Sequence, residues 1–74
     1  MISRGQIVTR LRDANFTFEE KKKRVEMYRE RGGLRHVAVP FRNFFTVDEA
    51  KIILAQAGLT ARQVEAFLGA CIKD

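Results

Sequence analysis

Apolar residues recur at the spacing of an α-helix near the start of the chain. The stripe comprises Ile7, Val8, Leu11 and Ala14. Ser3 precedes it and has Gln6 three residues later, which is the pattern of a capping box. Asn15 suits the end of the segment. We therefore predict an amphipathic helix of about three turns between Ser3 and Asn15.

Two further segments with helical periodicity occupy the last part of the chain. A capping-box pattern begins at Thr46, Gly58 suits the end of that helix, and a third capping box begins at Thr60. The apolar stripe of the first helix comprises Ile53, Leu54 and Ala57, and that of the second comprises Val64, Phe67, Leu68 and Cys71. The pattern predicts a pair of helices between 47 and 72.

The segment 16–40 has two interpretations. Local propensity favours a helix over 18–31, because good helix formers follow a capping-box pattern at Thr17–Glu20 and Gly32 would end it. The apolar stripe of such a helix would be thin, however, because lysines interrupt it.

The alternative for the same segment is a β-meander. Residues 34–39 alternate between apolar and polar side chains and end at Pro40, which cannot donate to a sheet ladder. A three-residue loop at 31–33, with a glycine in the left-handed position, would supply the upstream partner. Residues 16–20 would add a first strand. We predict the strands, because pattern and turn chemistry agree.

The three-residue loop also implies a register for this hairpin. It pairs Val25 with Val39 and Met27 with Val37, which places these four side chains on one face. The side chains expected on the opposite face are Glu26, Tyr28, His36 and Ala38. The predicted fold class is α+β, with one small domain over 1–74.

The net charge of +5 is confined to the N-terminal half. Residues 1–15 sum to +2, residues 16–35 sum to +3, and residues 36–74 sum to zero. A basic surplus on one part of a small domain suits a polyanion such as nucleic acid. It also suits an acidic protein surface.

The segment 41–45 interleaves three phenylalanines with Arg42 and Asn43. Such rings could stack on bases, but a domain this small also needs large apolar side chains in its core. We expect Phe44 and Phe45 to pack under the following helix. No metal-ligand spacing and no phosphate-binding glycine loop is present, so no cofactor or metal is expected.

Cellular context follows from composition. Cys71 is the only cysteine, so no internal disulfide can form, and we expect a small apolar role for it and a reducing cytoplasm for the protein. No apolar run is long enough to cross a bilayer, and charges interrupt the N-terminal region where a signal peptide needs apolar residues. We expect a cytoplasmic protein without a membrane partner.

Two segments resemble HicA toxins, the small mRNA interferases of HicA–HicB toxin–antitoxin pairs. HVAVP at 36–40 is similar to the end of the third strand of that family, and ILAQAGL at 53–59 is similar to the end of its second helix. The resemblance covers most of the chain. It implies a fold like the double-stranded-RNA-binding domain, in the order α-β-β-β-α, here with the C-terminal helix split in two. It also implies cleavage of mRNA without a metal, through RNA binding by this fold, and a HicB-like antitoxin as partner.

The chain departs from this family at the position of its catalytic motif. HicA toxins carry a G-S-H-like motif at the start of the second strand, and the matching positions here are Lys23, Arg24 and Val25. Valine cannot transfer a proton. His36 is the only histidine, and in the predicted register it lies near Glu26 and Tyr28. It is therefore the one candidate for a catalytic group.

The first functional hypothesis is an RNA-binding HicA-like domain without histidine-dependent mRNA cleavage. The residues expected to contact phosphates are Arg10, Arg12, Lys21, Lys22, Lys23, Arg24, Arg29 and Arg35. The alternative is a small basic module that binds a protein, as an inhibitor or regulator encoded on a mobile element. A nuclease that uses His36 is a third hypothesis.

Overall fold

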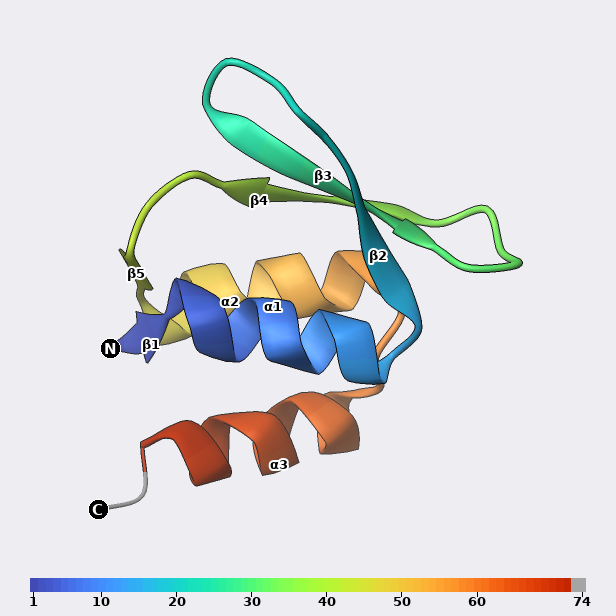
Figure 1. The fold of residues 1–74 in the computed structure, drawn as a ribbon. Coiled ribbons are helices and arrows are strands. Elements are labelled where there is room, and N and C mark those ends of the chain that lie inside the picture. Colours follow the sequence, from blue (N-terminus) through green and yellow to red (C-terminus); the bar gives the residue numbers. More distant parts are fainter. Residues whose placement is uncertain (73–74) are drawn as a thin grey trace.

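Three helices and two antiparallel sheets make up the fold in the computed structural model, which describes residues 1–72 (Figure 1). In chain order the elements are β1 (Ile2–Ser3), α1 (Arg4–Asp13), β2 (Phe16–Lys21), β3 (Val25–Glu30), β4 (His36–Pro40), β5 (Phe44–Phe45), α2 (Val47–Gln56) and α3 (Ala61–Cys71). The predicted α+β class is confirmed, including the order of a helix, three strands and a divided C-terminal helical region.

The helix boundaries follow from side-chain capping. At the start of each helix, the hydroxyl of Ser3, Thr46 or Thr60 accepts the backbone N–H three residues later, at 3.1 Å in all three cases. The side chain three residues later accepts the cap residue's own N–H, which completes the capping boxes predicted from the sequence. Asn15 and Gly58 follow α1 and α2 with φ of 72° and 82°, so both helices stop where left-handed backbone begins.

The segment 18–31 forms strands, as predicted, despite its high helix propensity. β2, β3 and β4 make one antiparallel sheet in the order β2-β3-β4. The sheet buries Phe16, Tyr28, Val37 and Val39. A helix over 18–31 would leave β4 without a strand partner. Tertiary burial therefore outweighs the local preference for helix.

The predicted register of the β3–β4 hairpin is wrong by one residue. Tyr28 pairs with Val37 and Glu26 with Val39, so Val25 lies opposite Pro40. The loop spans five residues, 31–35, because β4 begins at His36. A shift of one residue exchanges the two faces of a strand. Tyr28, only 4% exposed, therefore faces the helices, and Met27 lies on the outer face.

Burial of Tyr28 explains why the hairpin does not use the predicted three-residue loop at 31–33. Facing the helices together with Val37 and Val39, its ring removes more apolar surface from water than the Met27 side chain would. Gly32 has the predicted positive φ, 72°, but Leu34 lies in the loop and is exposed.

β1 and β5 form a second, two-stranded sheet that the sequence analysis did not predict. Ile2 pairs with Phe45 and Ser3 with Phe44. Ile2 and Phe45 are both fully buried, so the expectation that Phe45 packs in the core is confirmed. Phe44 is 55% exposed, so the same expectation for Phe44 is wrong. Alternation within a two-residue strand assigns one ring to each face.

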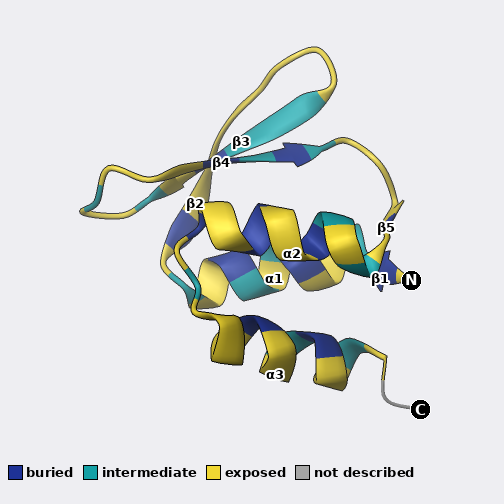
Figure 2. Cartoon of the chain, turned by 180° about the vertical axis from the view of Figure 1, so that it is seen from behind, coloured by how far each residue is buried: buried dark blue, intermediate teal, exposed yellow. Residues whose placement is uncertain are grey.

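The helices lie on one side of the three-stranded sheet. Figure 1 shows α1 and α2 beneath the sheet and α3 on the far side of these two helices. The buried surfaces face one another between these layers (Figure 2), and the buried side chains form one apolar cluster. The turn between β2 and β3 lies away from the helices, where residues 21–24 are exposed. Within 1–72, no helix has the length and apolarity needed to cross a membrane.

Candidate nucleic-acid interface

The turn between β2 and β3 carries the densest positive charge. We call residues Lys21, Lys22, Lys23 and Arg24 the hairpin tip; all four are exposed. The N–H of Lys22 donates to the carbonyl of Val25 at 2.9 Å and closes the turn. Among residues 1–72, no carboxylate lies within 4.0 Å of the charged groups of Lys21, Lys23 or Arg24. Three of the four charges are therefore available to an anionic ligand.

The acidic residues nearest to the tip have other partners or weak contacts. Glu26 pairs with Arg4, and Glu19 contacts His36 with 3.2 Å between Oε1 and Nδ1. Glu20 approaches Lys22 only at 4.0 Å, with both side chains more than half exposed. Exposed ion pairs such as Lys22–Glu20 stabilise a protein little, so another anion can readily replace Glu20 beside Lys22.

Phe41 lies beside the tip, on the connection between β4 and β5. Its N–H donates to the carbonyl of Arg24 at 2.8 Å, which continues the β3–β4 ladder past Pro40. The Lys21 ammonium lies 4.2 Å from the centroid of the Phe41 ring, and the Arg4 guanidinium carbon lies 5.2 Å from it. Both are within the range of a cation–π contact. The site therefore joins a basic turn to an exposed aromatic ring.

Arg4 is a member of this site that the sequence analysis did not select. Its guanidinium forms an ion pair with Glu26 and donates to the carbonyl of Pro40 at 3.0 Å. Tyr28 donates its hydroxyl to the same oxygen of Glu26 at 3.1 Å. We call Arg4, Lys21, Glu26, Tyr28 and Phe41 the Phe41 cluster. The sequence places Arg4 directly after the capping residue Ser3, and therefore at the start of α1. Its contact with β3 could not be predicted, because it forms only when the helix packs beside the sheet.

The eight predicted phosphate-binding residues do not form one patch. Four make up the hairpin tip. Of the others, Arg29 and Arg35 lie toward the opposite end of β3, and Arg10 and Arg12 lie on α1. The turn at 21–24 precedes β3 and the loop at 31–35 follows it, so the two lie at opposite ends of this extended strand. Arg31 N–H bonds the carbonyl of Asn15 at 2.8 Å, which places the end of α1 beside that loop.

Arg35 also has a local structural contact. Its guanidinium lies against Gly58, where an added Cβ would come within 2.6 Å of its central carbon. Gly58 lies two residues after Gln56, the last residue of α2, and the C-terminus of a helix favours positive charge. The tip is therefore the stronger candidate interface of the two groups.

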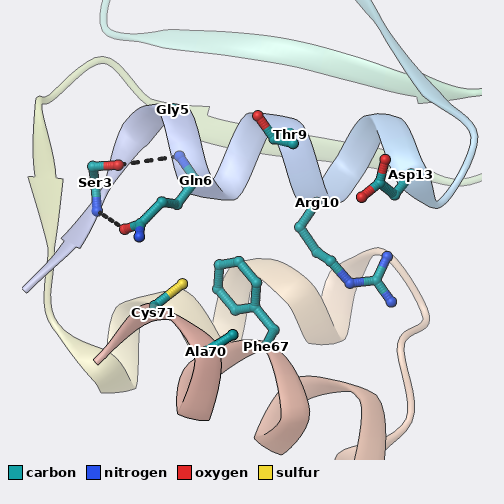
Figure 3. Close-up of a pocket in the computed structure, with 9 residues that line it drawn as sticks. All are labelled: Ser3, Gly5, Gln6, Thr9, Arg10, Asp13, Phe67, Ala70 and Cys71. Carbon is teal, nitrogen blue, oxygen red and sulfur yellow. Dashed lines mark hydrogen bonds between the residues drawn. The ribbon is translucent and has the colours of Figure 1, made fainter. Parts of the chain in front are cut away.

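Arg10 lies at a groove between α1 and α3 (Figure 3). The groove has a volume of about 540 Å³ and its lining includes Phe67 and Cys71, which point from α3 toward α1. Burial raises the pKa of the Cys71 thiol, and its side chain packs against the apolar cluster. The predicted role of Cys71 in the core stripe is confirmed.

The predicted cluster of Glu26, Tyr28 and His36 is not formed. Glu26 and Tyr28 do share a face and a hydrogen bond, but His36 lies opposite Arg29 on the other face of the sheet. The one-residue shift in register separates them. Among residues 1–72, no three His, Cys, Asp or Glu side chains are placed to hold a metal ion.

No protein-family model matches the chain, and no curated protein is significantly similar to it in sequence. The functional argument therefore depends on the geometry of the hairpin tip and the Phe41 cluster.

Proposed function

We propose that this chain is a cytoplasmic RNA-binding domain of the HicA-like type, acting within a toxin–antitoxin system without histidine-dependent mRNA cleavage. The observation that supports RNA binding is the hairpin tip: four consecutive exposed cations, three of them without a carboxylate within 4.0 Å among residues 1–72. Such a turn contacts phosphates without any need for a base sequence. At the position of the family's histidine this chain has Val25, which cannot act as an acid or base.

A gel-shift titration with a structured RNA tests the proposal. Binding is measured at about 50 mM and about 200 mM salt, because each phosphate contact releases counterions and steepens the salt dependence. With about four contacts, affinity should fall about 100-fold between these two concentrations. The absence of binding at the lower salt concentration, or binding that salt does not weaken, would contradict the proposal.

The second candidate is a module that binds an acidic protein, including a HicB-like antitoxin. Exposed phenylalanine and arginine side chains on the segment that follows β4, at Phe41, Arg42 and Phe44, support it, because aromatic residues and arginine are enriched in protein interfaces. A pull-down from nuclease-treated lysate, with the wild type and a variant in which the tip is neutralised, distinguishes the two candidates. A protein that survives nuclease treatment and requires the tip favours this second candidate; loss of all partners on nuclease treatment favours RNA.

A further inference from the structure

The Phe41 ring is held in an exposed position. Phe41 is 54% exposed, so burial contributes little to fixing its ring. Both groups of the peptide bond that precedes it are nevertheless hydrogen-bonded: the Phe41 N–H donates to the carbonyl of Arg24, and the Pro40 carbonyl accepts from Arg4. The Arg4 guanidinium also lies over the ring. An exposed ring held in place in this way is pre-organised for a contact outside the chain.

The support for this position extends into the core. Arg4 is oriented by its ion pair with Glu26, and the same carboxylate oxygen of Glu26 accepts the Tyr28 hydroxyl. Tyr28 is buried, and its ring also makes an edge contact with Phe18 at 5.9 Å between centroids. Tyr28 therefore positions Glu26, Glu26 positions Arg4, and Arg4 lies over Phe41. This series of contacts ties the orientation of the Phe41 ring to the sheet.

The Lys21 ammonium indicates the chemistry of the ligand. It lies 4.2 Å from the Phe41 ring centroid and belongs to the basic tip. A flexible lysine can leave a ring for a phosphate, which is the stronger partner for an ammonium. A ring and a phosphate-binding cation side by side match the two parts of a nucleotide, namely a flat base and its charged linkage.

We propose that Phe41 is a stacking platform for one unpaired base of the RNA ligand and that Lys21 contacts the adjacent phosphate. This inference rests on the proposed RNA binding and narrows the ligand class. Bases inside a continuous duplex are paired and stacked, so only an unpaired nucleotide in a loop, a bulge or a single-stranded overhang can be turned out onto the ring. The preferred ligand is then RNA that combines a duplex with an unpaired nucleotide.

The first experiment compares two RNAs with the same stem, one closed by a loop and one blunt-ended. Phe41→Leu should weaken binding of the looped RNA about tenfold, the typical value of one base–aromatic stack, and leave binding of the blunt duplex unchanged. Phe41→Tyr should restore the affinity for the looped RNA. The matched control is Phe44→Leu, because Phe44 is equally exposed at 55% but has no cation over its ring among residues 1–72.

The second experiment reads stacking directly. The chain has no tryptophan, so Phe41→Trp would introduce the only one. Its fluorescence should be quenched by the looped RNA and remain unchanged with the blunt duplex at equal occupancy. Equal losses for Phe41→Leu and Phe44→Leu, or equal quenching by both RNAs, would overturn the stacking role.

The two proposals fail in different ways. If no RNA binds with salt dependence, the proposed function itself is wrong. If RNA binds with the expected salt dependence and Phe41→Leu binds the looped RNA as tightly as the wild type, only the stacking platform is wrong. The salt dependence of Phe41→Leu should equal that of the wild type, since a stacked base releases no counterion.

Discussion

The Arg4 guanidinium and the Glu26 carboxylate form an ion pair that joins the first turn of α1 to strand β3. Their side chains are only 16% and 18% exposed. The pair lies 22 residues apart in sequence and forms only when the helix packs beside the sheet. It connects the fold to the candidate interface, because Arg4 also holds the Pro40 carbonyl and lies over Phe41.

Glu26→Gln should lower the free energy of unfolding by about 1–3 kcal/mol. It leaves the largely buried Arg4 guanidinium without its charged partner and weakens the hydrogen bond from the Tyr28 hydroxyl. Urea denaturation followed by circular dichroism measures the loss. The matched control is Glu20→Gln, whose exposed contact with Lys22 should contribute less than about 0.5 kcal/mol. Equal losses for both variants would show that the Arg4–Glu26 pair has no special role.

The register of the β3–β4 hairpin can be tested by truncating neighbouring side chains. Tyr28→Ala should cost about 3–5 kcal/mol, because the buried ring leaves a cavity. Met27→Ala, on the outer face, should cost only about 1 kcal/mol. Thermal unfolding of the two variants gives the comparison. A greater loss for Met27→Ala would support the register expected from sequence alone.

The two basic groups should differ in their effect on RNA binding. Replacing the four residues of the hairpin tip with glutamine should reduce the slope of log affinity against log salt by about 0.9 for each lost contact. The control replaces Arg10, Arg12, Arg29 and Arg35 and so removes the same amount of charge. Filter binding at several salt concentrations measures both slopes. If the control changes the slope as much as the tip variant, net charge rather than the tip governs binding.

Glu49 should make stability depend on pH in acid. Its carboxylate accepts the Thr46 backbone N–H and pairs with Arg42, and these contacts hold the pKa of Glu49 below its usual value. Because the pKa is lower in the folded state, the stabilisation is complete above the pKa of an unfolded glutamate and is lost as pH falls through the folded value. The stability difference between wild type and Glu49→Gln should be constant near neutrality and should shrink below about pH 4. A difference that stays constant down to about pH 2 would contradict this assignment.

His36 should be dispensable for any effect on growth. It lies on the outer face of the sheet, beside Glu19 and apart from Glu26 and Tyr28. Expression of the wild type and His36→Ala should therefore affect growth equally, with immunoblotting to confirm equal protein levels. Toxicity that only the wild type shows would restore the hypothesis of a nuclease that uses His36.

The helices could be predicted from the sequence in detail. Each begins with a capping box, at Ser3, Thr46 or Thr60, and α1 and α2 also have a residue suited to end them, at Asn15 and Gly58. Capping depends on residues three positions apart, so tertiary contacts are not needed to recognise it. The same local signals at Thr17–Glu20 favoured a helix that is absent, since β4 needs a strand partner.

The register of the β3–β4 hairpin and the composition of the candidate site could not be predicted from the sequence. The sequence is compatible with a loop of three residues, 31–33, and with one of five, 31–35. The choice between these two loops depends on whether Tyr28 or Met27 better fills the space between the sheet and the helices α1 and α2. The hairpin tip is recognisable in the sequence as a basic run, but its separation from Arg29 and Arg35 follows from the extended strand β3, which replaces the helix that local propensity favours.

By itself, then, the sequence determined the helices, the existence of the hairpin and the concentration of charge at 21–24, because these depend on neighbours along the chain. Only the tertiary structure decided which face of β3 is buried, and it alone brought Arg4 to Glu26 and Phe41 to the tip. These relationships join residues far apart in sequence. They depend on how well side chains fill the space between the sheet and the helices, a property that no local pattern records.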